Sequence, residues 1–418
     1  MTDVSAATSN PPGPEDQGRR GDGPLAGLRV LELGQLIAGP FCGQLLGDYG
    51  AEVIKIEDPA GGDPMRRWGH TDGTAAPVHW SVLARNKRSF GCDLRSPDGQ
   101  DLVRRLALTA DIVVENFRPG TLERWGLGYD ELSAANPGLI MVRVTGFGQT
   151  GPYAGRAGYG SIGEAMGGIR HLMGEPDRPP SRSGLSIGDS LAGTLGALGA
   201  VAAVVERASS GRGQIVDCAL YEAVLAMSES LVADYAAFGH VRERTGSVLP
   251  GVAPSNVYPT SDGADLLIAA NQDTVFRRLA AAMDQPALAD DPDYATHADR
   301  GRRQQALDDI ITAWTSTLTR REVEDRCLAH AVPVGLIYRA PEMLDDPHFA
   351  ARRSIVDVEV GADGTTLPMQ AVVPRFGRTP ARIRWAGPPL GDATDELLAE
   401  IDVDADTVAD LRRRGVIR

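Results

Sequence analysis

Lysine is almost absent from this 418-residue chain, because arginine supplies all but two of its 42 basic residues. The exceptions, Lys55 and Lys87, lie in the motifs VIKIE and ARNKRSF. A genome that favours arginine codons explains most of this imbalance. The two motifs that keep a lysine nevertheless call for closer inspection. The 56 acidic residues outnumber the basic ones, and the formal net charge of −14 argues against a nucleic-acid partner. A small anionic ligand held by a local cluster of arginines remains compatible with it.

Cysteine and histidine are too scattered for a disulfide framework or a metal site. The four cysteines show neither CxxC nor metal-ligand spacing, which fits a reducing cytoplasm. The seven histidines show no HxxxH or HxH pairing, so no metal is expected. No cysteine lies in a catalytic signature, which argues against one common kind of nucleophile.

No segment has the pattern of a signal peptide or a membrane span. Residues 1–24 lack an apolar centre and are expected to form a disordered tail. The longest apolar run lies between Asp189 and Glu206 and falls short of the length needed to cross a bilayer. We therefore expect a cytoplasmic protein with no membrane partner.

Short apolar runs alternate with helical patterns in the first half of the chain. Strands are expected over 28–33, 52–57, 111–117 and 139–147, and a helix over 96–110. This alternation predicts an α/β fold with a doubly wound parallel sheet that is covered on both faces. A chain of this length is also expected to contain more than one domain.

The pattern changes after residue 225, where helices surround a hairpin expected over 257–270. This stretch predicts a smaller α+β domain, and the strand-like 332–338 and Pro-rich 372–380 suggest that the chain then returns to the large domain. The expected organisation is a tail over 1–24, the first part of the large domain over 25–225, the small domain over 226–331, and the return over 332–418.

Two arginines, Arg118 and Arg124, follow closely on the strand expected over 111–117. In open α/β sheets, ligands bind in the crevice beyond the carboxyl ends of the strands, where arginine commonly meets phosphate. Arg95 and the NKRS segment at 86–89 are candidates to serve the same ligand. Each arginine taken singly is equally well explained as a solvated residue, but their placement after strands favours a phosphate-bearing ligand.

A G-x-G-x-x-G match, GFGQTG at 146–151, suggests dinucleotide binding. A true fingerprint needs a helix opening at the third glycine and an acidic residue at the end of the next strand. Here Pro152-Tyr153 and the cluster AGRAGYG follow instead. NAD is therefore the weaker interpretation, and we expect a ligand loop.

Asp189 stands just before a run of small and apolar residues that predicts a helix. One interpretation makes it the N-cap, with its carboxylate accepting a backbone N–H at the positive end of the helix dipole. The other is chemical, because the same position stabilises an ionised carboxylate and the neighbouring glycines let a substrate approach closely. A carboxylate in such a place can act as a nucleophile and form an acyl intermediate.

Six stretches, taken in order, resemble one family. They are LRVLELGQLIAGPFCGQLLGDYGAEVIKIEDP, NKRSFGCDL, DIVVENFRPGTLERWGLGYDEL, NPGLIMVRVTGFGQTGPY, IGDSLAG and GRGQIVDCALYEAVL. They look like the class III CoA-transferases, which include formyl-CoA transferase, carnitine CoA-transferase and alpha-methylacyl-CoA racemase. The resemblance runs in register from about residue 27 to 225 and more loosely to the C-terminus.

The resemblance implies a large Rossmann-like domain built from both chain ends, a smaller domain between them, and an interlocked homodimer. It implies transfer of coenzyme A from an acyl-CoA donor to a small carboxylic acid, without a metal. The catalytic aspartate of the transferases matches Asp189, which would carry a mixed-anhydride and thioester intermediate. The CoA contacts that carry over are Ile37, Ala38, Cys92, Asp93, Leu94, Arg95, Asn116, Phe117, Arg118, Arg124, Ala157, Gly158 and Tyr159.

Two departures from the family pattern bear on the ligand. Relatives hold an adenine-side arginine after KIE, and this chain has Asp58 there, so that contact is not carried over. Residues 245–259, TGSVLPGVAPSNVYP, replace the long glycine-rich loop of formyl-CoA transferase, which argues against formyl-CoA as the donor.

Two alternative functions stay open. A racemase needs two acid/base groups, and relatives with that activity carry a His-Asp pair where this chain has Tyr159-Gly160. Tyrosine is a poor base at neutral pH, since its ordinary pKa is near 10, so transfer is favoured. A catalytically silent CoA-binding protein is the other alternative, and the intact Asp189 argues against it.

Overall fold

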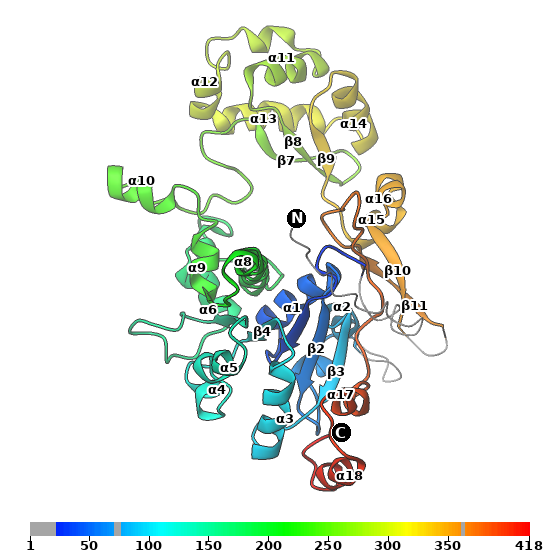
Figure 1. Cartoon of the computed structure of the whole chain (residues 1–418). Helices are drawn as coiled ribbons and strands as arrows, with labels where there is room; N and C mark the ends of the chain where they lie inside the picture. Colours follow the sequence, from blue (N-terminus) through cyan, green and yellow to red (C-terminus); the bar gives the residue numbers. More distant parts are fainter. Residues whose placement is uncertain (1–21, 71–76, 361–363) are drawn as a thin grey trace, which may run out of the picture. The chain divides into compact units, whose positions relative to one another are not determined.

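The computed structural model describes residues 22–70, 77–360 and 364–418 (Figure 1). Residues 1–21 of the expected tail lie outside the described part. The chain divides into two compact units. The first takes in the described residues up to Ile169 together with Gly184–Ser230 and Arg353–Arg418, and the second consists of Arg170–Ser183 and Leu231–Arg352. The first unit is thus built from both ends of the chain.

A six-stranded parallel sheet forms the centre of the first unit. Its strands are β1 (Arg29–Glu32), β2 (Glu52–Glu57), β3 (Lys87–Gly91), β4 (Ile112–Glu115), β5 (Ile140–Thr145) and β6 (Ile215–Ala219). Their order is β3-β2-β1-β4-β5-β6, and every neighbouring pair is parallel. The predicted α/β class with a parallel sheet is therefore confirmed. The strand order reverses between β1 and β4, and in such sheets ligands bind beyond the strand ends at this point.

Helices cover both faces of this sheet, as the alternation of strand side chains requires. Helices α1 (Ala38–Asp48) and α8 (Ile187–Ser210) share a core with Val30, Ile112 and Ile140. The adjacent strand residues Leu31, Val113 and Met141 belong to the opposite core, with α3 (Pro97–Ala107), α17 (Thr394–Glu400) and α18 (Ala405–Arg413).

The end of the chain is fixed to the end of β3. Ile417 forms an antiparallel bridge with Cys92, the N–H of Asp93 donates to Val416 O at 2.9 Å, and the N–H of Arg418 donates to Gly91 O at 3.1 Å. The C-terminal helices therefore complete the core of the first unit. The remaining elements of this unit are η1 (Pro64–Arg67), α2 (Val78–Leu83), α4 (Thr121–Arg124), α5 (Tyr129–Ala135), α6 (Gly160–Met166), α9 (Leu220–Leu225), β10 (Ile355–Glu359) and β11 (Thr366–Gln370), with α7 (Ile169–Leu172) at the boundary.

The second unit has its own antiparallel sheet of β7 (Ser255–Pro259), β8 (Asp265–Ala269) and β9 (Val334–Leu336). The hairpin expected over 257–270 is confirmed by the pairing of β7 with β8. Segment 332–338, expected to open the return to the large domain, instead supplies β9, which pairs with β8 because Val334 and Leu336 pack against the core of this unit. Its helices are α10 (Leu231–Phe238), α11 (Asp273–Ala282), η2 (Pro286–Ala289), α12 (His297–Arg302), α13 (Gln304–Thr315), α14 (Arg320–Ala329), α15 (Ala340–Asp345) and α16 (Pro347–Arg352). The expected small domain, 226–331, thus overlaps most of this unit.

Helix α8 runs for 24 residues and corrects one expectation. Within the described ranges it is the one helix long and apolar enough, by length and composition, to cross a membrane, whereas the sequence was expected to lack such a run. Its buried face is a stripe of glycine and alanine, and a Cβ added at Gly193 or Gly196 would meet Ala38 O at 2.7 Å or Val142 Cγ1 at 3.2 Å. Close packing on α1 and β5 accounts for its composition.

Candidate active site

The turn between β1 and α1 lies where the strand order reverses. Asn116, just beyond β4, accepts a hydrogen bond from the N–H of Gln35 and donates one to its carbonyl, both at 2.8 Å. Gly34 allows this approach, because a Cβ there would lie 3.1 Å from Oδ1 of Asn116. Ile37 is the N-cap of α1 and Ala38 its first residue. The structure thus brings Ile37, Ala38 and Asn116, all predicted contacts, to one place.

The only two lysines of the chain, Lys55 and Lys87, contact the turn between β1 and α1 or the start of α1. Lys55 and Lys87 are both buried and share Glu32, at 3.2 Å and 2.8 Å. Lys55 also pairs with Asp63 at 2.9 Å and donates to Gly34 O. Burial opposes the charge of Lys55, but Asp63 and Glu32 outweigh it and raise its pKa. The lysine motifs are therefore structural, and they fix the backbone of the turn.

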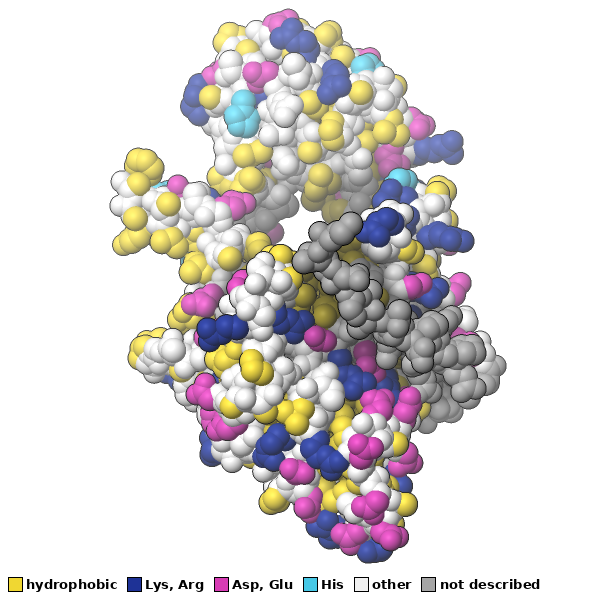
Figure 2. All heavy atoms as spheres, viewed as in Figure 1, with side chains coloured by type: hydrophobic (Ala, Val, Ile, Leu, Met, Phe, Trp, Pro, Cys, Tyr) yellow, Lys and Arg dark blue, Asp and Glu magenta, His cyan; other side chains and the backbone are white. Residues whose placement is uncertain are grey.

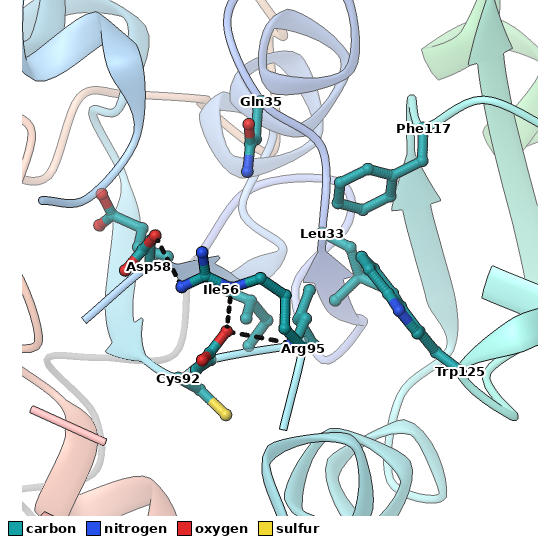
Figure 3. Close-up of a pocket in the computed structure, with 11 residues that line it drawn as sticks. Leu33, Gln35, Ile56, Asp58, Cys92, Arg95, Phe117 and Trp125 are labelled. Carbon is teal, nitrogen blue, oxygen red and sulfur yellow. Dashed lines mark hydrogen bonds and ion pairs between the residues drawn. The ribbon is translucent and has the colours of Figure 1, made fainter. Parts of the chain in front are cut away.

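A pocket of about 210 Å³ opens at the carboxyl ends of β1, β2 and β3 (Figure 3). It contains five of the predicted contacts, Cys92, Asp93, Leu94, Arg95 and Phe117. The other lining residues, Leu33, Gln35, Ile56, Glu57, Asp58 and Trp125, were not predicted as contacts. Its walls are thus mostly apolar, with a few charged groups, as is usual for a cofactor site.

Arg95 extends across this pocket toward Asp58 (Figure 3). Asp93 accepts from both the N–H and Nε of Arg95, at 3.0 Å and 2.7 Å, and Asp58 accepts from its NH2 group at 3.3 Å. The hydrogen bond and charge of Asp93, and then the charge of Asp58, raise the pKa of Arg95. Burial alone would raise the pKa of Asp93, but Arg95 keeps it below its usual value. Asp93 and Arg95 each favour the charged form of the other.

Arg118 and Arg124 are exposed and are not among the residues that line the pocket. Arg124 ends helix α4 and donates to Oγ1 of Thr121 at 3.1 Å. Their sequence neighbours Phe117 and Trp125 do line the pocket, and the two rings pack edge to face with centroids 5.3 Å apart. The arginines therefore stand beside the pocket rather than in it. Trp125 was missed, although an aromatic residue next to Arg124 in a glycine-bounded turn is a usable signal.

Asp189 lies in the first turn of α8 but does not cap it. The N-cap is Ser186, and Asp189 is the third residue of the helix. The N-cap interpretation of Asp189 is therefore wrong, since the helix begins three residues earlier than that interpretation requires. Gly193 packs directly on Ala38 four residues further along α8, a distance of about 6 Å along the helix axis. Asp189 is thus close to the start of α1.

The backbone of Gly160 packs against the Asp189 carboxylate. A Cβ at Gly160, the first residue of α6, would lie 2.1 Å from Oδ2 of Asp189. A Cβ at Gly188 would lie 2.8 Å from Gly160 O, and the N–H of Gly188 donates to Oε1 of the buried Glu164 at 3.4 Å. Gly160 and Glu164 were not predicted, because nothing in the sequence shows that α6 begins against α8.

The predicted contacts Ala157, Gly158 and Tyr159 form the approach to α6. Tyr159 is its N-cap and is 65% exposed. A Cβ at Gly158 would lie 2.6 Å from the Cα of Gly146, the first glycine of GFGQTG. No helix opens at Gly151, and the next one begins at Gly160. The G-x-G-x-x-G match is therefore a loop packed on the approach to Asp189.

The cysteine thiols and the possible metal ligands of the described residues do not suggest a further reactive site. Burial raises the pKa of Cys92 and Cys327 to about 12 and that of Cys218 to about 11, so these thiols stay protonated at neutral pH. In residues 22–70, 77–360 and 364–418, no group of three or more His, Cys, Asp and Glu could hold a metal ion.

The chain matches known proteins over nearly its whole length. The model of "CoA-transferase family III" matches residues 25–394. The succinyl-CoA–D-citramalate CoA-transferase of Chloroflexus aurantiacus is 56% identical over 395 residues, which cover 94% of this chain and 98% of the relative. The succinate–glutarate CoA-transferase of Agrobacterium fabrum is 39% identical, covering 91% and 96%. A CAIB/BAIF family protein from Brucella suis, solved as a crystal structure, has a TM-score of 0.81 and 36% identity, covering 91% of this chain and all of the other.

The resemblance noted in the sequence is thus confirmed by the family model, by the relatives and by the fold. Coenzyme A is the substrate common to this family. The chain belongs to CoA-transferase family III and is an enzyme of that family.

Proposed function

We propose that the enzyme transfers CoA from succinyl-CoA to a short dicarboxylate, with Asp189 as the nucleophile. The observation that carries the proposal is the position of the Asp189 carboxylate, against the backbone of Gly160 in the first turn of α8. The substrate class is supported by relatives named for succinyl-CoA with D-citramalate, L-malate and mesaconate, and for succinate with glutarate.

The reaction exchanges one thioester for another. The Asp189 carboxylate attacks the thioester carbonyl and the C–S bond breaks. CoA leaves as a thiolate, and the donor acyl group stays on Asp189 as a mixed anhydride. The thiolate attacks the aspartyl carbonyl and releases the donor acid, which leaves an aspartyl-CoA thioester. The acceptor carboxylate displaces the thiolate to form a second anhydride, and the thiolate then attacks the acceptor acyl carbonyl and frees Asp189. Glycine N–H groups nearby would stabilise the oxyanions.

The nucleotide end of CoA is assigned to the pocket and to the arginines beside it. The pocket offers apolar walls from Leu33, Ile56, Phe117 and Trp125 for a base. Arg95 inside it, and the exposed Arg118 and Arg124 next to it, offer guanidinium groups for phosphates. The start of α1 at Ile37-Ala38 lies between this pocket and the packing contact with α8, which supports a path for the thioester toward Asp189.

An interlocked homodimer is part of the proposal. Several helices carry apolar side chains that are exposed in the single chain, among them Leu198 at 62% and Phe238 at 83%. Figure 2 shows hydrophobic side chains gathered over α10. Exposed apolar surface of this kind usually marks an interface. Sedimentation equilibrium should give twice the chain mass, and a monomer would contradict this part of the proposal.

The central test compares wild type with Asp189→Asn. Since Asp189 is not the N-cap, asparagine should leave folding and CoA binding unchanged and abolish turnover, because an amide cannot form the anhydride. Wild type given succinyl-CoA and then hydroxylamine should carry a hydroxamate at Asp189, detected by peptide mass spectrometry. Normal transfer by Asp189→Asn would contradict the mechanism.

A panel of substrates tests the reaction independently of the role of Asp189. Products of succinyl-CoA with citramalate, malate, mesaconate or glutarate should include the CoA ester of the acceptor, as measured by mass spectrometry. A 2-methylacyl-CoA incubated in deuterated water should gain no deuterium at the α-carbon, because Tyr159-Gly160 offers no acid/base pair. Exchange at the rate of turnover would favour the racemase instead.

A further inference from the structure

Asp58 and Arg95 form an ion pair inside the pocket (Figure 3). Asp58 follows β2 and Arg95 follows β3, so neighbouring strands bring them together at the carboxyl edge of the sheet. The pair is open to water, with side-chain exposures of 37% and 68%. Exposed pairs of this kind are weak and easily exchanged for other partners.

The charges that line the pocket do not suit a phosphate as they stand. Among the lining residues, Glu57, Asp58 and Asp93 are acidic and Arg95 is basic. Glu57 is neutralised by Arg66, with two contacts of 2.7 Å. Two carboxylates therefore face one guanidinium, and their sum is a single negative charge. A phosphate that binds Arg95 must replace one of these two carboxylates as its partner.

The two carboxylates hold Arg95 differently. Asp93 accepts the backbone N–H and the Nε of Arg95, at 3.0 Å and 2.7 Å, and so fixes the local turn. Asp58 accepts only from the terminal NH2 group, at the longer distance of 3.3 Å. The terminal nitrogens are the ones a phosphate needs for bidentate binding. Asp58 is therefore the more weakly held of the two partners of Arg95.

We propose that Asp58 competes with a phosphate group of CoA for Arg95 and so lowers the affinity of the pocket for the charged end of the ligand. The proposal rests on the proposed function, which places that end of CoA in the pocket. When the ligand binds, the Asp58–Arg95 pair opens and an Arg95–phosphate pair replaces it. Removing the charge of Asp58 should then tighten binding, whereas a residue that merely supported the site would weaken it when replaced.

The test compares the CoA affinities of wild type and Asp58→Asn by titration calorimetry. Asparagine preserves the shape and the hydrogen bond that Oδ1 of Asp58 accepts from the N–H of Ala60 at 2.9 Å. Affinity for CoA should rise about threefold, the size expected for an exposed charge pair, and the gain should shrink at high salt. Asp58→Glu keeps the charge and should show no gain. Asp284→Asn, which takes a carboxylate from Arg326 outside the pocket, should also show none.

Three ligands identify the phosphate. If the gain appears with CoA but not with dephospho-CoA, the competing group is the 3′-phosphate. If it appears with both but not with pantetheine, the group is the diphosphate. An equal gain with pantetheine, no gain, or weaker binding by Asp58→Asn would overturn the role of Asp58 while leaving the proposed function intact. A wild type that binds none of the three would overturn both.

Discussion

Two parts of the first unit, the pocket at the carboxyl ends of β1–β3 and the surroundings of Asp189, are built in opposite ways. Side chains make the pocket, with Phe117 and Trp125 as walls and Arg95 held by two carboxylates. Beside Asp189, by contrast, the backbone packs closely, and Gly160 and Gly188 leave no room for a Cβ. A site made of side chains can change a residue and adjust its affinity, as Asp58 illustrates. The position of Gly160 cannot accept even a methyl group without moving the Asp189 carboxylate.

The largest effect on stability is expected at Lys55, which holds the turn between β1 and α1. Lys55→Met keeps the length of the side chain but leaves Asp63 without its cationic partner in the interior. Removing one member of a buried ion pair costs about 3–5 kcal/mol, so the denaturant midpoint should fall sharply. The exposed pair of Arg412 and Asp395 is the control, and Arg412→Met should cost less than about 1 kcal/mol. Equal midpoints for the two variants would show that Lys55 does not hold the turn.

Around Asp189 the expected loss is of activity rather than stability. The atom that a methyl group at Gly160 would meet is the far end of the Asp189 side chain, so Gly160→Ala should fold while the carboxylate moves. A displacement of about 1 Å costs about 100-fold in rate, measured as kcat with succinyl-CoA. Gly155→Ala is the matched control, because a Cβ there meets nothing within 4 Å. Wild-type kcat in Gly160→Ala would show that the carboxylate does not need its observed position.

The sequence predicts strands best where they are apolar and buried, as in β1, β2, β4 and β5. It does not predict β3, because KRSFG carries Lys87 and Arg88, whose burial depends on the distant Glu32 and Glu52. Edge strand β6 was also missed, since IVDCA is short and partly exposed. Of the arginines singled out by their placement after strands, Arg95 lines the pocket, whereas Arg118 and Arg124 do not. The role of Gly160 could not be predicted, because it depends on two helices that meet only in the folded chain.

The arginines beside the pocket should respond in the direction opposite to Asp58. Arg118→Ala and Arg124→Ala remove exposed cations near Phe117 and Trp125, and each should weaken CoA binding by about 1.5–3 kcal/mol, the range for a charge-assisted hydrogen bond. Calorimetry measures the loss, and Arg413→Ala, an exposed arginine of α18 paired with Asp410, is the control. Unchanged affinity in both variants would remove these residues from the binding site.

The smallest expected effect is the change with pH in the stability that the Asp63 carboxylate, the partner of Lys55, provides. Burial alone would raise the pKa of Asp63, but the charge of Lys55 and the N–H groups of Met65 and Leu36 hold it below its ordinary value of 3.8. A group with a lowered pKa in the folded state stabilises the protein above its ordinary pKa, and this stabilisation is lost as the pH falls through the folded value. Wild type should therefore be more stable than Asp63→Asn at neutral pH, and the gap should narrow as the pH falls below about 4.

Asp392 is the control for this experiment, because its pKa is shifted in the opposite direction to that of Asp63. Burial raises the pKa of Asp392 despite the hydrogen bond that it accepts from the N–H of Ser89. Its ionisation therefore opposes folding as the pH rises through the ordinary range of a carboxyl group, so Asp392→Asn should gain stability relative to wild type as the pH rises. Denaturant titrations of wild type and both variants from acid to neutral pH measure the difference in the free energy of unfolding between wild type and each variant. If the stability difference between wild type and Asp63→Asn does not narrow as the pH falls, while that for Asp392→Asn changes as expected, the charge of Lys55 does not control the titration of Asp63, and the buried network supports the turn through its packing alone.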